Sequence, residues 1–92
     1  MVNGSPLLRD ILNRIKWDDS YPSEEFQVTY IHRGVIGDQQ TVLFTDIIEI
    51  RSSWIIISNN NDDTQIPFHR IERVKNFVTG LILYEKSGRL ND

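Results

Sequence analysis

The sequence predicts an α+β fold in which one N-terminal helix packs on a curved, mainly antiparallel sheet of five or six short strands. Two observations predict it: only residues 6–16 repeat apolar residues every three or four positions, and the rest of the chain is divided into short β-rich runs by turn residues. Short connections favour antiparallel pairing, and a half-open barrel is an alternative arrangement of the same strands. With 92 residues and no interdomain linker, a single domain is expected over residues 1–92, with a core at 6–86 and a flexible tail at 87–92.

The helix expected at residues 6–16 is the most regular element. Its apolar side chains fall on one stripe and leave the charged side chains facing water. These apolar residues are Leu7, Leu8, Ile11, Leu12 and Ile15. Ser5 can cap the free backbone N–H groups, and Pro6 suits the first helical position because its missing N–H would have no partner there. Residues 17–24 hold aspartates, serines and a proline, which predicts an ordered loop with Trp17 covering the helix end.

The expected strands follow the loop, each marked by alternating or β-branched residues. They are expected at residues 25–32, 41–45, 47–51, 54–58, 64–68 and 81–86. Only two serines separate residues 47–51 from 54–58, which predicts a tight antiparallel hairpin. Periodicity leaves residues 66–74 undecided, because Ile66 and Phe68 fit a strand whereas Ile71 and Val74 fit a helical turn or a bulge.

Composition excludes several kinds of protein. No apolar run approaches the roughly 18 residues that span a membrane, and the N-terminus lacks the charged start and apolar middle of a secretory signal. We therefore expect a cytoplasmic protein with no membrane partner. The absence of cysteine rules out disulfides, thiolate metal sites and cysteine nucleophiles. The polar run at residues 59–63 lacks the glycine and the distal glutamate of a calcium loop, so no metal and no cofactor are expected.

The charge of the chain is acidic overall but uneven. A net charge of −3 argues against general coating of nucleic acid, which depends on many lysine and arginine contacts. Residues 1–65 carry five basic and ten acidic side chains (−5), whereas residues 66–92 carry five basic and three acidic ones (+2). Any anion site is therefore expected to depend on the second half of the chain.

Both histidines of the chain, His32 and His69, are followed directly by an arginine, Arg33 and Arg70. A guanidinium fork and an imidazole beside it can donate several hydrogen bonds to one phosphate group. Neighbouring residues of a strand point to opposite faces, so one member of each pair can equally be an ordinary solvated side chain. Familiar catalytic frames such as the nucleophile elbow and the phosphate-cradling glycine loop are absent, which favours binding over catalysis.

Three blocks of the sequence resemble a known family. They are the helix end Ile11–Asp18, the strand Tyr30–Gly34 and the stretch Ile66–Ile71. In this order they resemble the small, largely archaeal family of RNA cyclic group end recognition domains, over residues 6–86. The resemblance implies recognition of RNA ends that carry a 2′,3′-cyclic phosphate, in RNA repair or processing. The partners that it implies are RNA 3′ ends and RNA-repair or phosphoesterase proteins.

The resemblance and the residue chemistry together give a candidate binding site without catalytic residues. Arg33, His69 and Arg70 are expected to hold the terminal phosphate, which carries a single negative charge on a compact group. The stacking or supporting positions are Trp17, Asp18, Tyr30, His32 and Tyr84.

These supporting residues have different expected roles. Trp17 or Tyr30 would offer a flat face to a base, and Asp18 would orient an arginine or cap the local backbone. The family's usual pattern has aspartate where this chain has His32, so the resemblance does not support a role for that residue. It has tryptophan where this chain has Tyr84, a change that keeps an aromatic face.

Two functions of other classes remain open at this point. A phosphodiesterase acting on cyclic-phosphate ends would use His69 as acid or base with His32 as partner, and would need the two imidazoles about 5 to 8 Å apart. A protein-interaction adaptor would use the apolar hairpin at residues 47–57. The sequence does not predict the oligomeric state.

Overall fold

The computed structural model describes residues 5–32, 36–59 and 62–86. In chain order its regular elements are α1 (Ser5–Trp17), β1 (Phe26–Ile31), β2 (Gln39–Leu43), β3 (Ile47–Ile50), β4 (Trp54–Asn59), β5 (Asp62–Pro67), β6 (Ile71–Asn76) and β7 (Ile82–Glu85). Four short 3-10 turns connect them: η1 (Ser23–Glu25), η2 (Ile36–Asp38), η3 (Phe44–Asp46) and η4 (Phe68–Arg70). The α+β class is confirmed, with one helix and seven strands in the described residues. The tail expected at 87–92 lies outside them.

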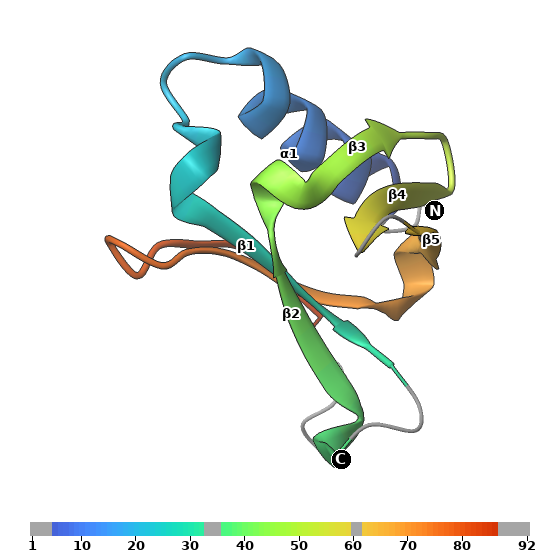
Figure 1. Ribbon diagram of the computed structural model, residues 1–92. Coiled ribbons are helices and arrows are strands. Elements are labelled where there is room, and N and C mark those ends of the chain that lie inside the picture. The colour runs from blue at the N-terminus through green and yellow to red at the C-terminus, as the bar shows by residue number, and fades with distance from the viewer. Residues whose placement is uncertain (1–4, 33–35, 60–61, 87–92) are drawn as a thin grey trace.

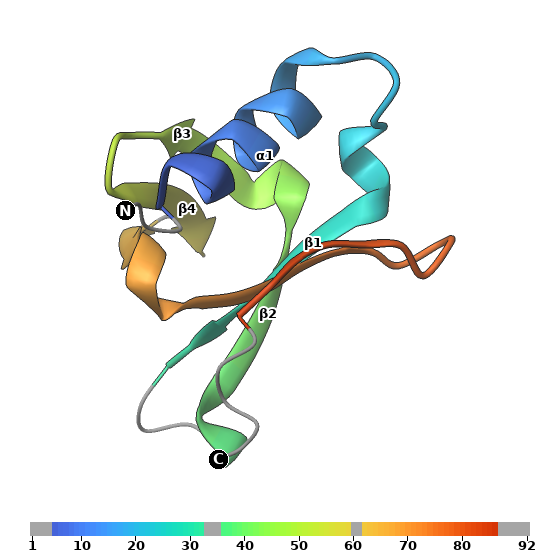
Figure 2. The same ribbon diagram turned by 180° about the vertical axis from the view of Figure 1, so that it is seen from behind.

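The strands form two antiparallel sheets rather than one. The first has the order β2-β1-β6-β7 and the second the order β3-β4-β5. Figures 1 and 2 show α1 on one side of the four-stranded sheet, with the three-stranded sheet beside the helix. The described strands do not close into a barrel.

The core lies where the helix and the inner faces of both sheets meet. From α1, Leu8, Leu12 and Ile15 are at most 1% exposed, as their spacing predicts, whereas Leu7 in the first turn is 59% exposed. The other buried apolar residues come from the sheets and from two turns. They are Phe26, Val28, Tyr30, Phe44, Ile47, Ile55, Ile57, Ile66, Phe68, Ile71 and Val74.

The apolar hairpin formed by β3 and β4 is confirmed and largely serves the core. Ile47, Ile55 and Ile57 are buried on its inner face, and Ile48 is the exposed apolar residue of β3. Because most of its apolar surface is already covered, the hairpin gives little support to the adaptor alternative. Within the described residues, no helix has the length and apolarity needed to cross a bilayer.

The stretch that periodicity left undecided contains the end of β5, the turn η4 and the start of the bulged strand β6. In the pairing of β1 with β6, Thr29 faces Arg73 and Tyr30 faces Ile71, so that Glu72 has no opposite residue. Ile71 and Glu72 are therefore both buried, at 0% and 8% exposure. A bulge of this kind breaks the alternation of buried and exposed residues, which explains why the sequence did not predict β6.

The start of the second strand also differs from the prediction. The loop was expected to continue to Gln40, but β2 begins at Gln39, which faces Ile31 across the pair. Gly37 and Asp38 lead into it with left-handed backbone angles, at φ 80° and φ 56°. Glycine and aspartate are among the residues that tolerate this conformation, so the turn can close tightly.

Candidate functional site

Four strand termini meet at one end of the four-stranded sheet, and His32, His69 and Arg70 follow or precede these termini. β1 and β6 are antiparallel, and Tyr30 near the end of β1 faces Ile71 at the start of β6. His32 directly follows β1, and the turn η4, which contains His69, directly precedes β6, so both leave the sheet at the same end. β2 begins and β7 ends at this end as well. We call it the histidine end.

On the β1 side of the histidine end, His32 is exposed but held in place. Its Nδ1 lies 2.8 Å from Oε1 of Gln40, and its ring stacks on Tyr30 with the centroids 6.0 Å apart and 19° between the planes. Its backbone N–H donates to the carbonyl oxygen of Asp38 at 2.9 Å. When Nδ1 donates its proton to Gln40, Nε2 is left for a ligand, as an acceptor in the neutral imidazole and as a donor in the imidazolium.

Tyr30 supports that ring from the core side. It is 3% exposed, and burial raises the pKa of its hydroxyl above the ordinary value. Burial of the phenol therefore leaves no free ring face on which a base could stack. Of its expected roles, Tyr30 can therefore only support the imidazole of His32, on which its ring stacks.

On the β6 side, η4 presents His69 and Arg70 to solvent. The turn is anchored by Phe68, which is 4% exposed, and its backbone N–H donates to the carbonyl oxygen of Ser53 at 2.9 Å. Among the described residues, Arg70 has no ion-pair or hydrogen-bond partner, so its guanidinium group can take an anion.

Lys86 links η4 to the end of β7. Its Nζ donates a hydrogen bond to the carbonyl oxygen of His69 and lies 3.9 Å from Oε2 of Glu72. Its backbone N–H donates to the carbonyl oxygen of Glu72 at 2.9 Å. Lys86 therefore fixes the turn that carries His69 and partly offsets the carboxylate beneath it. The sequence analysis did not select this residue, because its contacts arise only from the pairing of β6 with β7.

Tyr84 packs beside this link. It is half-buried against the core, and burial raises the pKa of its hydroxyl, with the negative charge of Glu72 adding to the effect. The neutral phenol is thus the form at the histidine end. Its half-buried ring fits a supporting position better than an open stacking face.

Trp17 and Asp18 lie near the opposite end of β1. Asp18 Oδ1 accepts the backbone N–H of Ser20 at 2.9 Å, and the carbonyl oxygen of Asp18 accepts the N–H of Tyr21 at 2.9 Å. Tyr21 in turn packs against Phe26 at the start of β1. Five residue steps of about 3.3 Å separate this start from the end of the strand, or about 17 Å.

The two residues therefore do not join the histidine end. Asp18 caps the local backbone, which was one of its two expected roles. Trp17 was expected to cover the helix end, but its side chain is 75% exposed, and Lys16 Nζ lies 5.6 Å from the centroid of its ring. Arg33, the third expected phosphate ligand, lies outside the described residues, although it directly follows His32.

A hollow of about 350 Å³ lies between the last turn of α1 and the loop that follows it. Its charged lining is formed by Lys16, Asp18, Asp19 and Glu24. Three carboxylates against one ammonium group repel a phosphate, so this hollow is not the anion site. No group of three or more histidine, aspartate or glutamate side chains in the described ranges is arranged to hold a metal ion.

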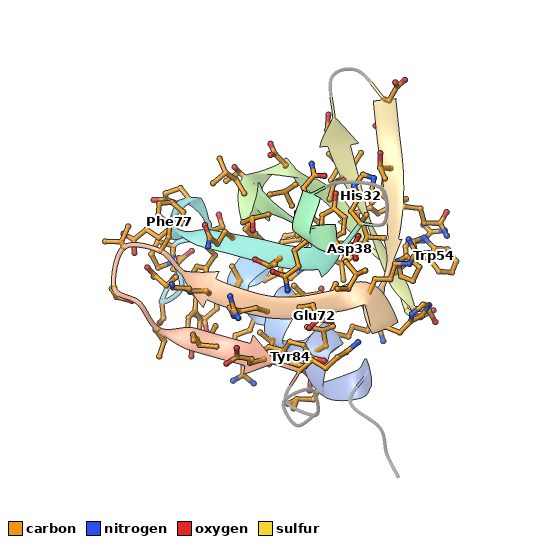
Figure 3. The ribbon with its side chains drawn as sticks, turned by 90° about the horizontal axis from the view of Figure 1, so that it is seen from below. His32, Asp38, Trp54, Glu72, Phe77 and Tyr84 are labelled. Carbon is orange, nitrogen blue, oxygen red and sulfur yellow. The ribbon has the colours of Figure 1, made fainter. Side chains whose placement is uncertain are left out.

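Figure 3 shows how the labelled side chains are distributed. His32 and Asp38 lie on one side of the view together with Trp54, and Phe77 lies on the other side. Glu72 and Tyr84 lie between them, on the neighbouring strands β6 and β7. The histidine end thus combines imidazole, guanidinium and ammonium groups with the carboxylates of Asp38, beside His32, and of Glu72, which Lys86 approaches. This set of groups suits a small anion bound at an exposed surface.

Comparison with known proteins gives one family and several relatives. Residues 7–86 match the model of a family described as the MJ1316 RNA cyclic group end recognition domain. The UPF0248 protein MJ1316 of Methanocaldococcus jannaschii is 38% identical over 80 residues, which are 87% of this chain and 94% of that protein. The UPF0248 protein MmarC7_1289 of Methanococcus maripaludis is 36% identical over 80 residues, 87% of this chain and 99% of that protein. A UPF0248 protein of Pyrobaculum calidifontis is 28% identical over 82 residues, 89% of this chain and all of that protein. No solved structure matches the chain.

Proposed function

Because the chain belongs to the family of the MJ1316 RNA cyclic group end recognition domain, as its motifs predicted, we propose that it binds RNA 3′ ends carrying a 2′,3′-cyclic phosphate. The observation that carries the proposal is the placement of His32, His69 and Arg70 at one end of the four-stranded sheet. Arg33 belongs to the proposal because it follows His32 directly in the sequence.

The chemistry of the ligand fits a small site. A cyclic phosphodiester has one negative charge, and one guanidinium fork with one or two imidazole donors can satisfy its oxygens. A wide basic surface is not needed, so the net charge of −3 is compatible with the role. Lys86 reduces the repulsion from Glu72, since its Nζ lies 3.9 Å from that carboxylate.

The wider role follows from the same ligand. RNA ends with cyclic phosphates are products of RNA cleavage, so the protein would act in RNA repair or processing, in the cytoplasm. RNA-repair or phosphoesterase proteins would be its partners there. In this proposal the protein recognises the end and leaves the chemistry to the partner.

The test is a comparison of three ends on one RNA sequence. Oligonucleotides that end in a 2′,3′-cyclic phosphate, a linear 3′-phosphate or a hydroxyl are titrated with the protein, and affinity is measured by fluorescence anisotropy. The cyclic end is expected to bind best. Equal binding of all three, or none, would contradict the proposal.

A matched pair of variants locates the site in the same assay. Arg70→Gln removes a charged hydrogen bond and is expected to weaken binding about 10- to 100-fold, as hydrogen bonds to charged groups are worth about 1.5 to 3 kcal/mol. Arg14→Gln changes the charge equally on the exposed side of α1 and is expected to leave binding within about twofold. Similar losses for both variants would show that only the net charge matters.

The phosphodiesterase alternative is kept because His32 follows the end of β1 and His69 lies in the turn before β6, which supports a shared location. The RNA recovered from the binding assay decides between the two functions. Intact cyclic ends after prolonged incubation support pure recognition. Conversion to a linear phosphate by the wild-type protein, abolished in His69→Gln, would establish the enzyme instead.

A further inference from the structure

The base next to a bound cyclic phosphate can be held by stacking on an aromatic face, and most rings of the described chain cannot provide one near η4. Four rings are at most 4% exposed: Phe26, Tyr30, Phe44 and Phe68. Phe77 is 45% exposed, but it follows β6 at the far end of the sheet from η4 (Figure 3). Trp17 is exposed at the end of α1, near the start of β1 and also away from η4.

Trp54 has the required place and orientation. Ile55 and Ile57 of β4 are buried on the inner face of the three-stranded sheet, so the alternation of the strand puts Trp54 on the outer face, where it is half-buried. Its direct partner across the pair is Pro67, the residue before η4. Part of the side chain is therefore exposed beside the turn that carries His69.

The geometry limits how far apart the two residues can be. Cross-strand partners have Cα atoms about 5 Å apart, and the two steps from Pro67 to His69 add at most about 7 Å. The Cα atoms of Trp54 and His69 are thus within about 12 Å. The hydrogen bond from Phe68 N–H to the carbonyl oxygen of Ser53, at 2.9 Å, holds the two segments together.

We propose that Trp54 forms a base-binding subsite, on which the nucleobase of the terminal nucleotide stacks while η4 holds its phosphate. The inference rests on the proposed function and adds to it that the ligand is a whole nucleotide end, not a phosphate alone. Every base has a π face, so stacking on the indole ring tolerates all four bases. Half-burial also limits the motion of the ring, so little conformational freedom is lost on binding.

The test removes the base instead of the phosphate. Two RNAs with 2′,3′-cyclic phosphate ends are compared, identical except that in one the terminal sugar lacks its base. The wild-type protein is expected to prefer the complete end about 5- to 100-fold, which corresponds to the usual strength of one base stacked on an aromatic ring. In Trp54→Leu the preference is expected to fall to about twofold or less. Trp17→Leu serves as the matched control and is expected to keep the wild-type preference.

The ratio of two affinities is used because it does not change when part of the protein is unfolded. A second measurement avoids altering Trp54 at all. The chain has two tryptophans, so Trp17→Phe leaves Trp54 as the sole indole. Its fluorescence is expected to be quenched by the complete end and to change much less with the baseless end.

The outcomes separate this inference from the proposed function. A preference that persists in Trp54→Leu, or quenching that is equal for both ends, overturns the base subsite while cyclic-end binding stands. If wild-type protein binds neither cyclic-phosphate RNA, both proposals fail together.

Discussion

Lys86 Nζ donates a hydrogen bond to the carbonyl oxygen of His69, and so joins the end of β7 to the turn that carries the proposed phosphate ligands. This contact explains how an exposed turn of three residues can present His69 and Arg70 in a fixed arrangement. A turn held at both sides, by Phe68 in the core and by Lys86 at the surface, requires less ordering when a ligand binds.

Lys86→Met is expected to weaken binding of cyclic-phosphate RNA about 3- to 10-fold, since a net hydrogen bond is worth about 1 kcal/mol and the charge near Glu72 is lost as well. Anisotropy titration measures the loss. Lys16→Met, which makes the same change in the exposed last turn of α1, is the control and is expected to have little effect. Equal losses for the two variants would contradict a positioning role for Lys86.

The salt dependence of binding reports how many phosphate contacts are made. Two or three cationic contacts on single-stranded RNA predict a slope of log K against log salt between about −1.4 and −2.1, at about 0.7 per contact. Titrations at several salt concentrations give this slope. A value steeper than about −4 would indicate a broad electrostatic surface, contrary to a site of a few residues.

Tyr30, which is buried, and Tyr84, which is partly buried, predict a loss of stability at alkaline pH. Burial raises the pKa of Tyr30 above its ordinary value of about 10, because the phenolate would lose its hydration. Folding thus favours the neutral phenol over the phenolate. The stability that this preference contributes is complete below pH 10 and is lost as the pH rises through the folded-state pKa. Urea unfolding of Tyr30→Phe between pH 7 and 11 is expected to show a smaller alkaline loss than the wild type. If both proteins lose the same free energy of unfolding at alkaline pH, ionisation of Tyr30 is not the cause.

The same reasoning applies to Tyr84, where burial and the charge of Glu72 raise the pKa together. Tyr84→Phe is expected to reduce the alkaline loss, and Glu72→Gln is expected to reduce it by less, since burial is the larger cause. Absorbance at 295 nm follows ionisation of the phenols directly. If Tyr84 ionises at the same pH in Glu72→Gln as in the wild type, the charge of Glu72 does not contribute to the raised pKa.

A matched pair of leucines tests where the core lies. Leu12 in α1 is 0% exposed, whereas Leu43 at the end of β2 is 47% exposed. Leu12→Ala is expected to lower the free energy of unfolding by about 2 to 5 kcal/mol, because it leaves a cavity. Leu43→Ala is expected to lower it by less than about 1 kcal/mol. Chemical denaturation measures both, and similar losses would contradict the packing of α1.

Much of the fold could be predicted because its signals are local. The spacing of Leu8, Leu12 and Ile15 was sufficient to locate α1, and Ser52 with Ser53 located the turn between β3 and β4. Pairing across the sheet is not local, and the bulge at Glu72 buries two successive residues only because Tyr30 faces Ile71. The division into two sheets depends on the same distant contacts.

The candidate site was predictable to a similar extent. Repetition of a histidine and arginine pair selected His32 and His69, and antiparallel pairing brings them to one end of the sheet. The sequence alone did not predict that Trp17 lies near the other end of β1. It also did not predict that Trp54 pairs with Pro67 beside η4. These placements depend on how the strands pair.

The most direct test of the histidine end is an NMR titration of the labelled protein with a nucleoside 2′,3′-cyclic monophosphate. The account predicts that the largest amide shift changes fall on His32, His69, Arg70 and Lys86, and that the loop at residues 18–24 stays unchanged. Changes concentrated at that loop or at the β6–β7 turn, with none at η4, would contradict it.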